Sequence, residues 1–177
     1  MTATGKGNYT DSVSATFTIA KAAGETSVSI AGWTYGESAN APVVNSTTGN
    51  NEVTYLYEST DGKGHSSEAA PTNAGAYKLT VTFATTDTHN GTTASAEFTI
   101  AKATPDVTAP TGLNATYGDT LADVELDTGW TWKDATTTEV GNADENSFAV
   151  IYTKDNSGNY NTVEKTVTIT VSPKTVT

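Results

Sequence analysis

One strand sequence occurs three times in this chain, and this repetition limits the possible folds more than any other feature. The residues Phe-Thr-Ile-Ala-Lys-Ala stand identically at Phe17–Ala22 and at Phe98–Ala103. A related stretch, Val-Thr-Ile-Thr-Val, stands at Val167–Val171, so the copies begin 81 and then 69 residues apart. Self-similarity of this kind indicates that one structural unit recurs along a chain.

We therefore expect the 177 residues to divide at these strands. Residues 1–22 are interpreted as the terminal strand of a truncated preceding repeat, which is frayed or pairs with the edge of a neighbouring sheet. Residues 23–103 form one complete unit, and residues 104–177 form a second, shorter unit with the start of the next linker. A unit of about 70–80 residues buries about 60–65% of its unfolded surface, which suffices for a modest core.

Alternation of apolar and polar residues predicts strands throughout. The residues expected to face the cores in this way are Tyr77, Leu79, Val81, Phe83, Phe148, Val150 and Tyr152. Abundant Thr favours strands, and Gly, Asn and Pro mark the turns between them. The predicted fold is all-β, with tandem Ig-like β-sandwich repeats of about six or seven short strands each. β-grasp-like units are the alternative, but no stretch has a helical period over three turns. Leu121–Leu126 suits a single helical turn or an irregular strand.

Charge and composition exclude several partners. The chain has nine Lys, no Arg and a formal net charge of −11, so it lacks the guanidinium groups that dominate phosphate recognition, and we expect no nucleic acid partner. It has no Cys, which excludes disulfides and thiolate metal sites. It also has no apolar run long enough to span a bilayer, so we expect no membrane insertion within this fragment.

Two motifs recur at corresponding positions of both units. Tyr-Gly-acid stands near the start of each, at Tyr35–Glu37 and Tyr117–Asp119. An Asn-Ala turn comes later in each unit, and Asn159-Tyr160 precedes the last strand, with His89 at the tyrosine position of the earlier unit. In these motifs the chain resembles bacterial cell-surface repeats of the Ig-like and MBG kind, whose YGX-type members carry Tyr-Gly-x.

This resemblance implies a secreted, multi-repeat protein of the bacterial cell surface or cell wall, in which such units space or present adhesive domains. It offers no catalytic residues, cofactors or metal ligands. The function expected from it is a non-catalytic structural spacer, or stalk, that presents distal adhesive or enzymatic domains. Its expected partners are the neighbouring repeats of the same chain.

The remaining candidate sites are few. His65 and His89 lack a nucleophile or metal-ligand spacing; His65 is expected to be solvated and His89 to pack at its turn. Lys154–Asn159 gathers oxygen donors, but its spacing favours an Asx-rich turn over a calcium loop.

Three tryptophans define the alternative function. Trp33, Trp130 and Trp132 are candidates for stacking on a sugar ring. With exposed rings they would make the chain an adhesin-type binding module for host glycans or mucin. The competing interpretation is core packing, because small β cores commonly need one or two large aromatic residues.

Overall fold

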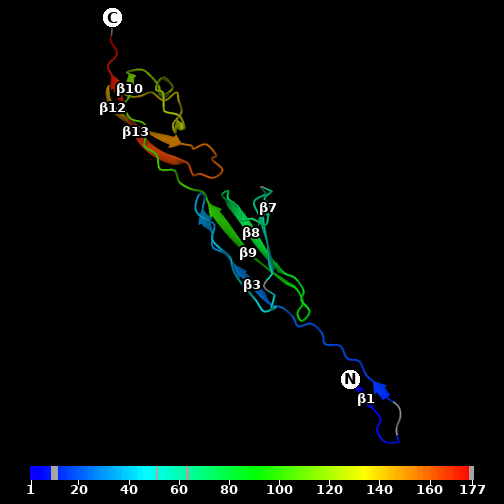
Figure 1. Ribbon diagram of the computed structural model, residues 1–177. Helices are drawn as coiled ribbons and strands as arrows, with labels where there is room; N and C mark the ends of the chain where they lie inside the picture. Colours follow the sequence, from blue (N-terminus) through cyan, green and yellow to red (C-terminus); the bar gives the residue numbers. More distant parts are fainter. Residues whose placement is uncertain (9–11, 51, 63, 176–177) are drawn as a thin grey trace.

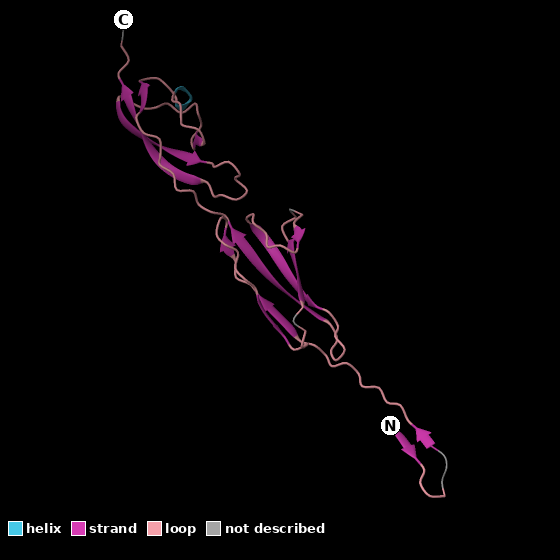
Figure 2. Cartoon of the chain, in the orientation of Figure 1, coloured by secondary structure: helices cyan, strands magenta, loops and turns pink. Residues whose placement is uncertain are grey.

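The computed structural model describes residues 1–8, 12–50, 52–62 and 64–175 of the chain. The molecule is elongated, with a small N-terminal hairpin at one end and the C-terminus at the other (Figure 1). Strands make up the regular structure of the described residues, apart from one 3₁₀ turn (Figure 2). The all-β prediction is therefore confirmed.

The first β-region covers residues 26–101 and contains two sheets. Its strands are β3 (Thr26–Ser29), β4 (Trp33–Thr34), β5 (Val43–Ser46), β6 (Val53–Ser59), β7 (Ser66–Ser67), β8 (Gly75–Phe83) and β9 (Thr92–Ala101). β3 pairs with β5, and the other strands form a sheet in the order β4-β9-β8-β6-β7. Within this larger sheet β4 runs parallel to β9, and the other pairs are antiparallel.

The core of the first β-region lies between these two sheets. As the alternation predicted, Tyr77, Leu79, Val81 and Phe83 of β8 are all buried. The Phe98 ring of β9 lies beside them. From the smaller sheet, aliphatic residues of β3 and β5 pack against the same cluster. The arrangement is consistent with a β-sandwich.

The second β-region covers residues 113–172 and contains one sheet. Its elements are β10 (Leu113–Thr116), the 3₁₀ turn η1 (Leu121–Asp123), β11 (Trp130–Trp132), β12 (Asp144–Tyr152) and β13 (Val163–Ser172). The strand order is β10-β13-β12-β11, and β10 runs parallel to β13.

A layer without strands covers this sheet. Leu121 of η1 is fully buried there, and Val107 and Ala109 of the preceding linker pack against the same side of the region. The described residues 113–172 hold four strands, fewer than the six or seven predicted. Pro105 and Pro110 in the linker lack the N–H that a ladder needs, so the linker contributes apolar cover without pairing.

The terminal strands β9 and β13 correspond with a spacing of 71 residues, two more than the sequence match indicated. The Tyr35 N–H donates to the Ala101 carbonyl (2.9 Å), and the Tyr117 N–H donates in the same way to the Ser172 carbonyl (2.8 Å). Phe98 therefore corresponds to Ile169. Side chains alternate with a period of two, so a slip of two residues leaves the buried face unchanged and escapes pattern matching.

The N-terminal segment departs from the strand expected there. Within its described residues, the two short strands Thr2–Thr4 (β1) and Ser12–Ser14 (β2) pair antiparallel, and Ala15–Lys21 lie outside any strand. Phe17 and Ile19 are 74% and 82% exposed, because no sheet in the described part of the chain covers them. Phe98, in contrast, lies on β9, which pairs with β8.

Candidate functional site

A buried network of hydrogen bonds lies at the joint between the two β-regions. Ala103 follows β9 and pairs as a parallel bridge with Tyr160 of the second β-region. The Ala103 N–H donates to the Asn159 carbonyl (3.0 Å), and the Asn161 N–H donates to the Ala103 carbonyl (2.9 Å). Both backbone groups of this linker residue are therefore tied to the region that follows.

The Asn159 side chain holds the joint from the other side. It is only 4% exposed. Its Oδ1 accepts from the Ala74 N–H (2.7 Å), and its Nδ2 donates to Asn73 Oδ1 (3.0 Å). The Ala74 N–H can only donate, which fixes the orientation of the carboxamide. A buried amide is tolerated when its hydrogen bonds are made, and this one bonds across the joint with both of its polar atoms.

We call the two hydrogen bonds of the Asn159 side chain across the joint the Asn159 clamp. Aromatic and cationic side chains lie around it. The Tyr35 and Tyr160 rings meet edge to face, with centroids 5.3 Å apart. Lys154 Nζ lies 4.1 Å from the centroid of the Tyr160 ring, and Lys102 Nζ donates to the Ser157 carbonyl (3.0 Å). An edge-to-face pair contributes about 0.5–1.5 kcal/mol beyond the burial of its area, and an exposed cation over a ring about 0.5–1 kcal/mol.

The Lys154–Asn159 segment thus has a place in the joint. It forms the turn that carries the clamp, and the Asn159 N–H donates back to the Asn156 carbonyl (2.9 Å). Among the described residues, no group of three or more His, Asp or Glu side chains is placed to hold a metal ion.

The opposite end of the first β-region carries half of the same joint. Ala22 bridges His89 in parallel, as Ala103 bridges Tyr160. The Ala22 N–H donates to the Thr88 carbonyl (2.8 Å), and the Asn90 N–H donates to the Ala22 carbonyl (2.9 Å). Thr88 stands where the other turn has Asn159, and its hydroxyl contacts Nδ1 of His89 (2.9 Å). The backbone contacts recur, while the carboxamide clamp does not.

The Tyr-Gly-acid motif places an aromatic ring at the end of each region that faces the C-terminus. In the first motif, Glu37 Oε2 accepts from the Thr34 N–H (2.8 Å); in the second, Asp119 Oδ2 accepts from the Thr116 N–H (2.8 Å). The central glycines have φ of 90° and 94°, a conformation that glycine adopts readily. This turn puts Tyr35 beside the clamp.

The three tryptophans lie in or beside the cores. Trp33 is 8% exposed and stacks on Phe98, with centroids 5.1 Å apart; Trp130 is 9% exposed and packs against Tyr152. Trp132 is half-buried, and its Nε1 donates to the Val124 carbonyl (3.4 Å). A hollow of about 280 Å³ is lined in part by Trp130 and Trp132, and another of about 290 Å³ by Trp33. Glycan contact by these residues stays a prediction.

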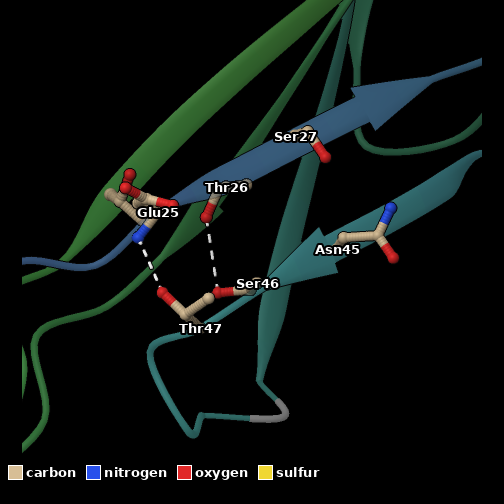
Figure 3. A pocket seen from close by; sticks show the side chains of 7 residues that line it. Glu25, Thr26, Ser27, Asn45, Ser46 and Thr47 are labelled. Atoms are coloured by element: carbon tan, nitrogen blue, oxygen red, sulfur yellow. Dashed lines mark hydrogen bonds between the residues drawn. The ribbon is translucent and has the colours of Figure 1, made fainter.

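A larger hollow is lined by the paired strands β3 and β5 and their flanking residues. It measures about 590 Å³ and is lined by Glu25, hydroxyl-bearing residues and Asn45 (Figure 3). Its polar groups partly satisfy one another, because the Glu25 N–H donates to Thr47 Oγ1 (3.0 Å) and Thr26 Oγ1 donates to Ser46 Oγ (3.4 Å). None of its lining residues is aromatic, so it offers no face on which a sugar ring can stack.

The histidines differ in their surroundings. His89 takes the turn position of Tyr160, as expected. His65, predicted to be solvated, is half-buried instead. Its ring meets the Tyr77 ring edge to face, with centroids 5.7 Å apart. The loop that carries it folds back on β6, where the Ser59 N–H donates to the His65 carbonyl (2.9 Å).

Comparison with known proteins adds no relative. No protein-family model matches the chain, and no curated protein matches it in sequence. Within residues 1–8, 12–50, 52–62 and 64–175, no helix has the length and apolar character needed to cross a membrane.

Proposed function

We propose that the chain consists of tandem Ig-like units that act as a non-catalytic spacer, or stalk, of an extracellular bacterial surface protein. The strands β6, β8 and β9 are neighbours in the larger sheet of the first β-region, and β11, β12 and β13 are neighbours in the sheet of the second. Strands C, F and G are neighbours in the same order in an Ig-like sheet. The parallel pairing of an early strand with the last one also recurs. The surface location and the distal domains rest on the resemblance of the Tyr-Gly-acid motifs to MBG-type repeats.

The Asn159 clamp is the observation that carries this proposal. The first β-region is bound to Ala22 at its lower end, nearer the N-terminal hairpin, and to Asn159 at its upper end, so successive parts of the chain lie in series (Figure 1). A spacer must hold its units in one direction. Backbone bonds to the linker together with a buried side-chain clamp restrict rotation at the joint in the way that this role requires.

Replacing Asn159 with alanine is expected to loosen the joint. The change removes both hydrogen bonds that the Asn159 side chain makes across the joint, to the Ala74 N–H and to Asn73 Oδ1. Loss of such a bond costs about 1–3 kcal/mol where the group is buried. The chain has no native cysteine, so Glu97→Cys and Thr168→Cys, both exposed, accept two spin labels uniquely. We expect one narrow label-to-label distance in the parent and a broad distribution in the Asn159→Ala variant.

The matched control is Asn45→Ala, which removes an exposed asparagine of β5 far from the joint. It should leave the distance distribution narrow. A broad distribution in the parent, or a narrow one that Asn159→Ala leaves unchanged, would contradict the spacer proposal.

The adhesin alternative keeps one observation in its favour, the hollows beside the tryptophans. For a spacer we expect blue-shifted tryptophan emission and weak acrylamide quenching that no glycan of a soluble panel, nor mucin, alters. Protection of the emission by one glycan, lost on Trp132→Phe, would instead make the chain a binding module.

A further inference from the structure

The surface that receives the clamp in the first β-region exists again in the second. In the first, it is made of Tyr35 after β4 and of Asn73 and Ala74 directly before β8. In the second, Tyr117 follows β10, and Asn142 and Ala143 directly precede β12. We call these last three residues the Tyr117 face.

The backbone around the Tyr117 face is built like that around Tyr35. The Asp119 carboxylate accepts from the Thr116 N–H as the Glu37 carboxylate accepts from the Thr34 N–H. The N–H groups of Tyr117 and Tyr35 both donate to the terminal strand of their region. β10, which leads to Tyr117, lies at the end of the molecule beside the C-terminus (Figure 1).

The two surfaces differ in what covers them. Ala74 is buried under the Asn159 turn, and Tyr35 is half-buried against Tyr160. Tyr117 is 51% exposed, and both Asn142 and Ala143 are exposed. An aromatic ring at this position is therefore paired in one region and uncovered in the other.

We propose that the Tyr117 face is a docking surface for the turn-bearing lower end of another β-region of this kind. The occupant is defined by its chemistry: a carboxamide that accepts from the Ala143 N–H and donates to Asn142 Oδ1, followed by an aromatic ring that meets Tyr117 edge to face. This inference deepens the proposed spacer and rests on it, because it names the partner that a further joint would take.

Continuity with the existing joint supports this occupant. The lower ends of both β-regions already bind the last residue of a Phe-Thr-Ile-Ala-Lys-Ala sequence, Ala22 in one case and Ala103 in the other, by the same pair of backbone bonds. With the spacing of 71 residues, Lys174 takes the place of Ala103 at the Tyr117 face. The loop is braced differently there, since Asn146 Nδ2 donates to the Asn142 carbonyl (2.8 Å). That hydrogen bond is made by the backbone carbonyl of Asn142 and does not involve the Asn142 side chain.

The test extends the full chain with its own lower end. A second copy of residues 104–172 is joined after Lys174, so that its Asn159 turn can reach the Tyr117 face. One protein carries spin labels at Glu97→Cys and Thr168→Cys across the existing joint; another carries them at Thr168→Cys in both copies, across the new joint. We expect a narrow distance peak at each joint. Two variants should each abolish the peak at the new joint only. One is Tyr117→Ser in the original copy, and the other is Asn159→Ala in the added copy.

Each other outcome overturns a distinct statement. A narrow peak at the existing joint with a broad one at the new joint overturns the docking surface and leaves the spacer standing. Broad peaks at both joints overturn the spacer as well. A narrow new peak that survives both variants overturns the assignment to the Tyr117 face. In the unextended chain, Tyr117→Ser should leave hydrogen exchange of residues 113–172 unchanged, which separates lost docking from lost folding.

Discussion

Leu79→Ala is expected to lower the free energy of unfolding of the first β-region by about 2–5 kcal/mol, the range for removing a buried leucine side chain. Leu79 is fully buried at the centre of β8, where it belongs to the cluster of Trp33, Phe98 and Ile100. The second β-region has its own apolar clusters. Native-state hydrogen exchange, read separately for residues 26–101 and 113–172, should show lost protection in the first only.

The matched control for this variant is Leu56→Ala. Leu56 lies on the neighbouring strand β6, but it is partly exposed, so the change should have a much smaller effect. Equal loss of protection in both β-regions would contradict two cores that unfold separately.

Trp130→Ala is expected to have the largest effect in the second β-region, about 3–5 kcal/mol for truncation of a buried indole. Trp130 packs with Val150 and Val167 and lies 5.2 Å from the Tyr152 ring, centroid to centroid. Urea denaturation followed by circular dichroism, with hydrogen exchange to assign the transition, measures the loss.

Tyr117→Ala serves as the comparison, because it removes a large aromatic side chain from an exposed position of the same region. Surface changes of this kind usually stay within about 0.5 kcal/mol. A small effect of Trp130→Ala would show that its ring is not part of the core, and would favour a binding role for it.

Much of the fold follows from local pattern. The alternation along Tyr77–Phe83 predicts the buried face of β8, because successive side chains in a strand point to opposite sides. Tyr-Gly-acid predicts a tight turn, and the positive φ of Gly36 and Gly118 agrees with it. These features depend on a few neighbouring residues, so the sequence states them directly.

The number of strands in the second β-region depends on longer-range packing. The linker residues Val107 and Ala109 are apolar and alternate as strand residues do, yet they cover the sheet without joining it. The flanking prolines supply the reason, but only once the sheet that they cover is known.

The joint was the hardest part to foresee. Asn159 and Asn73 are 86 positions apart, and no alternation or motif relates them. Asn73 belongs to the Asn-Ala turn of the first unit and Asn159 to the Asn-Tyr pair of the second, and turn formation accounts for such residues equally well. What the sequence does contain is an asparagine at Asn159 where the other turn has Thr88, a difference whose meaning depends on the neighbouring region.

The parallel pairing of each terminal strand decides how these regions respond to tension. When the ends of the chain are pulled apart, β4 is drawn toward the entry end of its region and β9 toward the exit, so the two strands slide along each other. Their hydrogen bonds are then loaded together instead of opening one after another. β4 offers a ladder of two residues, Trp33–Thr34, whereas β10 offers four, Leu113–Thr116. The β4–β9 ladder should therefore separate at a lower force than the β10–β13 ladder.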